Sequence, residues 1–210
     1  MIGVQLLLYP QLLEMQGVIV FIAEPVVILH VYGIVFYWLT NNNVQQDEIL
    51  WGAIPFGLFS GVLEISHISI EVFGHLTPRS ETISTGLFLC VVFIPWGVAG
   101  YWLTRKRGKM TGLLTGSFSA MLCMLLVVTY GFLQLFWALP HLIEKNIGSP
   151  DLIRSGWTDL KAFTIADIFA SGFKVLLVGP IVGGLLGTVG GLIALLAIWR
   201  KSNSKDSLES

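Results

Sequence analysis

Two glutamates and two histidines alternate along one apolar stretch of the sequence: Glu64, His67, Glu71 and His75. At about 100° per residue, these four side chains fall within roughly 80° of one helical face. The opposite face carries isoleucine, valine, leucine and phenylalanine, which suit contact with lipid. The Glu-x-x-His and His-x-x-x-Glu spacings place two ligating groups on one face of a helix. The stretch therefore predicts a polar site inside a helical bundle.

The stripe has the chemistry of a path for protons or small cations. Histidine titrates near neutral pH, and lines of acidic and imidazole groups serve as relays in pumps and transporters. We expect Glu64, His67 and Glu71 to form the centre of a site that translocates a proton-coupled solute, a small cation or a metal. The acidic residues expected to face this site from other helices are Glu24 and Asp167.

Carboxylate and imidazole groups also suit a divalent transition metal such as zinc, iron or manganese. Glu64 and His75 are eleven positions apart, about 16 Å along a helix, so one ion cannot use the whole stripe. Further ligands would come from other segments, and a metal is the one cofactor expected. The alternative prediction is an intramembrane metal-dependent enzyme, and the sequence leaves open whether the chain is catalytic. The candidate ligands are Glu64, His67, Glu71, His75, His141 and Glu144.

The composition indicates a membrane protein. Of 210 residues, 54% are hydrophobic and 12% are charged, whereas a soluble domain carries about 25% charged residues. The mean hydropathy is +0.78 and the formal charge is −1. These values argue against a soluble enzyme, a disordered chain and a nucleic-acid binder, which needs a basic face. The expected surroundings are the lipid bilayer, with no nucleic-acid partner.

Apolar runs long enough to cross a bilayer need about 20 residues. Five such runs predict an all-α, polytopic integral membrane helix bundle with about five transmembrane helices. A sixth span exists if residues 2–13 also cross. Residues 162–173 either begin the last span or form a re-entrant piece. The predicted spans are 18–40, 49–76, 83–104, 110–139 and 175–199.

The basic residues predict the orientation of the chain. Seven lie in the 105–109 loop and the C-terminal tail, whereas four lie in the loops on the other side. Cytoplasmic loops carry the excess of lysine and arginine, so we expect the C-terminus in the cytoplasm and the plasma (inner) membrane as host. We expect one transmembrane domain over residues 1–200, followed by a polar tail over residues 201–210.

Glycines recur every fourth residue in the last predicted span. Such small-x-x-x-small repeats let a second helix approach closely, and shorter versions occur at positions 57/61 and 112/116. The partner helix lies either in the same chain or in another one. A third interpretation is therefore a non-catalytic membrane subunit that binds a membrane protein partner, or a second copy, through this face. The glycines are Gly179, Gly183, Gly187 and Gly191.

Overall fold

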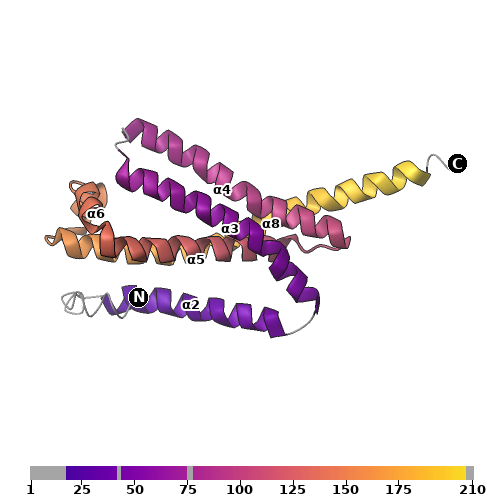
Figure 1. Ribbon diagram of the computed structural model, residues 1–210, viewed down its shortest axis with the longest axis horizontal. Coiled ribbons are helices and arrows are strands. Elements are labelled where there is room, and N and C mark those ends of the chain that lie inside the picture. Colours follow the sequence, from indigo (N-terminus) through magenta and orange to yellow (C-terminus); the bar gives the residue numbers. More distant parts are fainter. Residues whose placement is uncertain (1–17, 42–43, 75–77, 207–210) are drawn as a thin grey trace.

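The computed structural model describes residues 18–41, 44–74 and 78–206. This part of the chain is helical and contains no strand, which confirms the predicted all-α bundle. Figure 1 shows the arrangement of the helices. The helices are α2 (Val18–Asn41), α3 (Val44–Phe73), α4 (Pro78–Arg107), α5 (Gly112–Trp137), α6 (Leu139–Asn146), α7 (Pro150–Ser155) and α8 (Leu160–Asp206).

Four stretches among the described residues are long and apolar enough to cross a membrane. They correspond to the predicted second, third, fourth and last spans. The predicted first span is also helical, as α2, but its apolar part, Val26–Tyr37, is shorter. Residues 2–13, which decide between five and six spans, lie outside the described part. The four spans are Glu48–Phe73, Phe88–Arg107, Gly112–Trp137 and Leu160–Lys201.

The last span belongs to a single long helix. Helix α8 is continuous from Leu160, so residues 162–173 begin this helix and form no re-entrant piece. It also continues through the first part of the predicted polar tail, to Asp206. Its 47 residues extend for about 70 Å, roughly twice the hydrocarbon thickness of a bilayer. The C-terminal part of α8 accordingly projects beyond the other helices (Figure 1).

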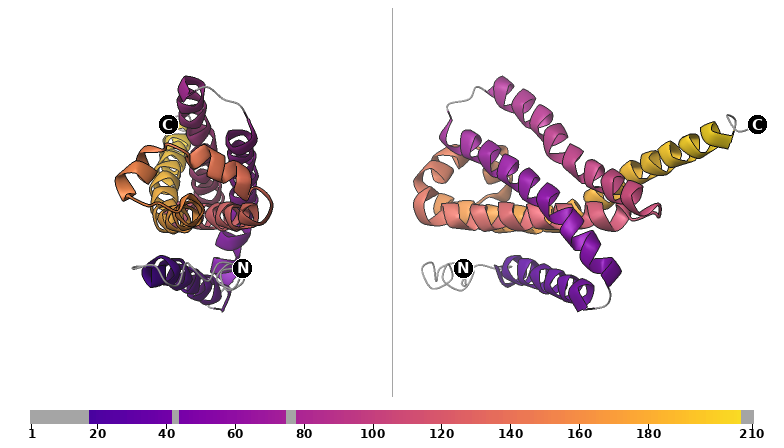
Figure 2. Two further views of the ribbon diagram at one scale, coloured as in Figure 1. Left: turned by 90° about the vertical axis from the view of Figure 1, so that its left-hand side faces the viewer. Right: turned by 45° about the vertical axis from the view of Figure 1, so that its right-hand side comes forward.

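The bundle is built around α5 and α8, which lie against each other over much of their length. Helix α4 crosses α8, and α3 packs on α4 and α5. Two views show that α3 and α4 separate from α5 toward the end that carries α6 (Figures 1 and 2). This separation makes room for polar side chains between α3, α5 and α8.

The glycine repeat of α8 packs inside the subunit. A Cβ atom on Gly187 would lie 2.8 Å from Cα of Gly116 and would overlap the carbonyl oxygen of Gly112 on α5. Gly100 of α4 meets the backbone of Gly187 in the same way. Side chains at these positions would force the three backbones apart. The sequence left open whether the glycine repeat of α8 packs on helices of the same chain or of another one. Helices α4 and α5 of the same chain cover it, so a partner protein would need another surface.

Small residues also bring α3 close to α5 and α4. A Cβ atom on Gly57 would lie 2.6 Å from the carbonyl oxygen of Ser119 on α5. The Ser119 hydroxyl donates to the carbonyl of Ala53 at 3.1 Å, and the Ser60 hydroxyl donates to the carbonyl of Val92 on α4 at 3.2 Å. Each of these buried hydroxyls is satisfied by a backbone oxygen, as a lipid-embedded polar group must be.

A proline in α8 explains how α2 is attached. Pro180 has no N–H group, so the carbonyl of Leu176, one turn earlier, loses its helical partner. The hydroxyl of Tyr32 on α2 donates to this carbonyl at 2.6 Å. Tyr32 and Leu176 are both buried. The polar contact between α2 and α8 therefore forms where the proline frees an acceptor.

The glycine contacts predict that alanine lowers thermal stability at a packed glycine but not at an exposed one. Gly187→Ala should lower the thermal unfolding temperature of the purified protein, because overpacking a tight contact costs about 1–3 kcal/mol and here the neighbours are backbone atoms. Gly86→Ala is the matched control, since a Cβ atom there meets nothing within 4 Å. It should be neutral or gain up to about 1 kcal/mol from helix propensity. Equal melting temperatures for the two variants would contradict this packing.

Candidate functional site

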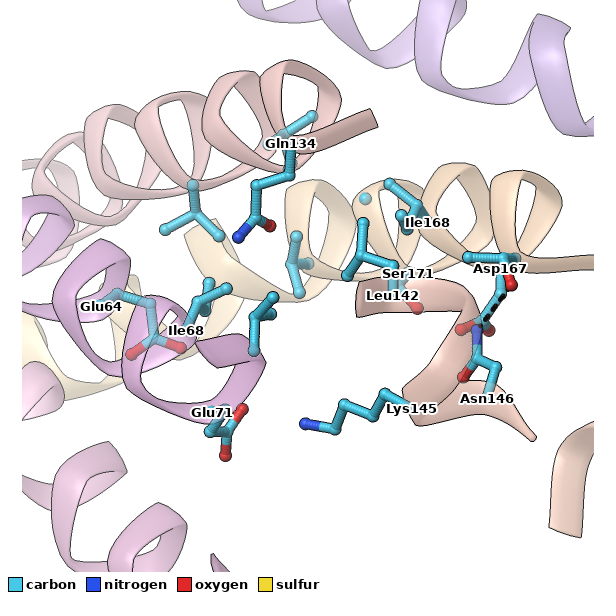
Figure 3. A pocket seen from close by; sticks show the side chains of 17 residues that line it. Glu64, Ile68, Glu71, Gln134, Leu142, Lys145, Asn146, Asp167, Ile168 and Ser171 are labelled. Atoms are coloured by element: carbon cyan, nitrogen blue, oxygen red, sulfur yellow. Dashed lines mark hydrogen bonds between the residues drawn. The ribbon is translucent and has the colours of Figure 1, made fainter. Parts of the chain in front are cut away.

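A cavity of about 460 Å³ lies between α3, α5, α6 and α8. It is found where α3 separates from α5, beside α6, and Figure 3 shows it from close by. Its walls combine aliphatic side chains with a few charged and amide groups. The polar lining residues are Glu64, Glu71, Gln134, Lys145, Asn146, Thr164, Asp167 and Ser171.

Three of the predicted acidic residues share this cavity. Glu64 and Glu71 come from α3, and Asp167 comes from α8. The two glutamates are seven residues apart, about 10 Å along the helix. Asp167 lies across the cavity from them (Figure 3). The structure thus brings Asp167 to the same space as the α3 stripe. Glu24, the other predicted partner, is half-buried on α2 and does not line the cavity.

Glu64 presents an unsatisfied oxygen. Its Oε2 atom is buried and makes no hydrogen bond within the described part of the chain. Most buried polar atoms in proteins have a partner, and leaving a charged or polar one unpaired costs free energy. Such an atom beside a cavity marks a place where a ligand or water is needed.

Gln134 is the main site residue that the sequence pattern does not predict. It comes from α5, is only 3% exposed and lines the cavity. Its Nε2 atom is buried and makes no hydrogen bond within the described residues. One sequence signal was available: Gln134 is the only amide in a helix of 26 residues without a charged side chain.

His67 occupies the interface between α3 and α4 and is not among the residues that line the cavity. It is 4% exposed, and its ring stacks on Phe88 of α4 at a centroid distance of 4.4 Å. Its Nε2 atom lies 3.5 Å from Oε1 of Glu71. The Thr85 hydroxyl donates to the same oxygen at 2.7 Å. Glu71 therefore connects the cavity to a buried imidazole behind it.

Helix α6 contributes two further lining residues. The amide nitrogen of Asn146 donates to the Thr164 hydroxyl at 3.1 Å, which ties α6 to the beginning of α8. Lys145 extends from α6 toward the side of the cavity that carries Glu71 (Figure 3). Together the lining holds three carboxylates and one ammonium group. With all four ionised, the formal charge is −2.

The predicted metal ligands do not converge in the described residues. No group of three His, Cys, Asp or Glu residues there is placed to hold a metal ion. His141 is exposed and contacts the ring of Phe73 edge-on, at 5.3 Å between centroids. Glu144 is also exposed, and His75 lies outside the described residues. A metal centre stays a prediction that rests on spacing alone.

Comparison of the chain with protein families, with curated proteins and with solved structures finds no match. The site is therefore described by its own chemistry. It is an acidic cavity with aliphatic walls, and three of the four helices around it are long and apolar enough to cross a membrane. It holds two buried polar atoms without partners in the described residues, Oε2 of Glu64 and Nε2 of Gln134.

Replacing the unpaired amide of Gln134 with an apolar side chain should stabilise the fold and remove a polar group from the cavity. Gln134→Leu keeps a similar volume and removes a buried polar group without a partner, so it should stabilise the fold by about 1–3 kcal/mol. The measurement is the thermal unfolding temperature in detergent. Thr129→Val is the control: this exposed hydroxyl bonds only the carbonyl of Leu125 on its own helix, so the change should be near zero. A lower unfolding temperature for Gln134→Leu would show that the amide has a structural partner.

Proposed function

We propose that this protein is a membrane carrier that translocates a small cation or a proton-coupled solute through the acidic cavity. The observation that carries the proposal is the convergence of Glu64, Glu71 and Asp167 on one cavity between membrane-spanning helices, with Glu64 Oε2 buried and unpaired. Carboxylates inside a membrane protein are costly, and they are usually paired or functional. A cationic solute supplies the missing partner.

The packing beneath the cavity supports a carrier that exposes its site to one side at a time. Gly57 and Gly61 of α3 lie close to Ser119, Leu122 and Leu126 of α5, without space for a Cβ atom. These contacts close the bundle on the side away from α6. Carriers of this type move solutes by rocking one group of helices against another around a central site. In this proposal α3 separates from α5 at these glycines to open the opposite side.

His67 supports the proton-coupled form of the proposal. Its imidazole faces Glu71, which also lines the cavity, so a proton can be held at His67 while a cation occupies the carboxylate side. The groups around the ring are Glu71 at 3.5 Å and Glu64, one turn earlier, on its own helix, and the stacked Phe88 on α4. Histidine is the side chain whose ordinary titration range lies closest to neutral pH.

Glu64→Gln should reduce solute-driven flux at least tenfold while leaving the fold intact, because it removes the charge and keeps the shape. The measurement compares uptake of labelled Na⁺, K⁺, Mn²⁺ or ethylammonium by proteoliposomes with uptake by protein-free liposomes, and an internal pH-sensitive dye reports coupled proton movement. Glu48→Gln is the control, since Glu48 is an exposed residue at the opposite end of the bundle and does not line the cavity. Absence of flux for every solute with the unmodified protein would refute the carrier.

The proposed orientation places the cavity at the outer side of a plasma (inner) membrane and the C-terminus in the cytoplasm. The ion pair between Arg107 and Glu48, at 2.9 Å, lies at the opposite end of the bundle from α6, beside the basic 105–109 loop. In a variant without native cysteines, Lys201→Cys should react with an impermeant maleimide only after the cells are opened, whereas Asp151→Cys should react in intact cells. The reverse pattern would invert the orientation.

A further inference from the structure

We infer that the occupant of the acidic cavity is a small organic ammonium compound with an apolar body. This inference rests on the proposed function and specifies its substrate class. It joins three properties of the cavity: excess negative charge, aliphatic walls and a buried amide without a partner.

The negative groups are distributed rather than gathered at one point. Glu64 and Glu71 are about two helical turns apart on α3, and Asp167 lies on the other side of the cavity (Figure 3). A bare divalent cation requires about six oxygen ligands at 2.0–2.6 Å. No three acidic, histidine or cysteine residues of the described chain are placed in that way. The spacing favours a larger cation whose N–H groups reach separate acceptors.

The walls between these acceptors are apolar. They include Ile68 of α3, Val128 of α5, Leu142 of α6 and Ile168 of α8. A volume of about 460 Å³ lies within the range of small-molecule sites, roughly 300–1,000 Å³, which combine apolar walls with a few polar groups. Such walls contribute nothing to a hydrated inorganic ion. They favour a ligand that carries hydrocarbon next to its charge.

Gln134 is an independent indication of a ligand. Its side chain is almost completely buried and points into the cavity (Figure 3), and its Nε2 atom has no hydrogen-bond partner in the described residues. A primary amide offers one carbonyl acceptor and two N–H donors. A half-turn of the amide group places its carbonyl oxygen where Nε2 lies, and there the oxygen can accept from an ammonium N–H group while a carboxylate neutralises the charge. A ligand that forms a hydrogen bond with Gln134 would explain why this buried amide lacks a partner within the protein.

The same ammonium chemistry has two sources. One is a soluble amine, and the other is the head group of an aminophospholipid whose chains remain in the bilayer. Both present an ammonium group, which in the amine is bonded directly to the apolar body and in the lipid is joined to it through a two-carbon link and a phosphate. The experiment therefore includes nanodiscs prepared with phosphatidylcholine alone and nanodiscs that also contain phosphatidylethanolamine.

The test is calorimetric titration of the whole protein in phosphatidylcholine nanodiscs with ethylammonium, propylammonium, butylammonium and pentylammonium. Affinity should rise about fourfold per methylene, the factor that corresponds to burial of one CH₂ group. Pentanoate, which has similar length and opposite charge, should bind at least tenfold more weakly than pentylammonium. Competition by phosphatidylethanolamine would assign the site to the lipid, and its absence would assign it to soluble amines.

Single-residue variants test whether pentylammonium binds in the acidic cavity. Asp167→Asn and Gln134→Leu should each weaken pentylammonium binding at least tenfold, whereas Glu48→Gln, at the opposite end of the bundle, should leave it unchanged. Thermal unfolding of each variant shows that the fold is kept, and Gln134→Leu should be at least as stable as the unmodified protein. Loss of affinity in a more stable protein separates a binding role from a structural one.

Two outcomes distinguish the substrate class from the carrier. Flux or binding of Na⁺, K⁺ or Mn²⁺ without binding of any alkylammonium overturns the organic ammonium and leaves the carrier intact. Alkylammonium binding without flux of any solute overturns the carrier and leaves a binding protein for amines. Equal binding of pentanoate and pentylammonium overturns the proposed recognition of charge.

Discussion

The close approach of three backbones where α8 crosses α4 and α5 is the constraint on which the rest of the structure depends. Gly187 of α8 meets Gly100, Gly112 and Gly116 with no space for a side chain. Helices that cross at an angle diverge on either side of the crossing, whereas α5 and α8 stay in contact over much of their length. The divergence of α3 and α4 from α5 leaves the space that becomes the acidic cavity. Packing at one level of the bundle thus creates the opening at another.

The polar groups of the bundle fall into two sets with different energetics. The hydroxyls of Tyr32, Ser60 and Ser119 each donate to a backbone carbonyl of another helix. In a medium without water these bonds replace hydration, and they hold helices that hydrophobicity alone would not. Glu64 and Gln134 have no such partner. These three hydroxyls are satisfied where helices are joined, whereas one atom each of Glu64 and Gln134 is left without a partner at the cavity.

The sequence was sufficient for four of the five predicted spans and for part of the site. Apolar runs give long helices in lipid because the backbone must bond to itself, and an acidic residue within such a run is conspicuous, as with Glu64 and Asp167. The sequence did not show that His67 packs against α4 while Glu71 lines the cavity. A stripe of side chains about 80° wide on one helix can contact two neighbouring helices at once. The sequence pattern did not predict Gln134 as a site residue, because an uncharged amide occurs at many helix positions without a functional role. Whether the glycines of α8 pack within one chain depends on three-dimensional proximity that a repeat does not encode.

The length of α8 has a mechanical consequence. Ala194 is still buried in the bundle, and 12 residues follow it to Asp206, a distance of about 18 Å. A bend of about 10° beyond Ala194 would move the far end by roughly 3 Å, while atoms next to Ala194 move much less. The projecting end of α8 is thus a lever. It converts a small angular change where the helix leaves the bundle into a larger displacement at its C-terminal end.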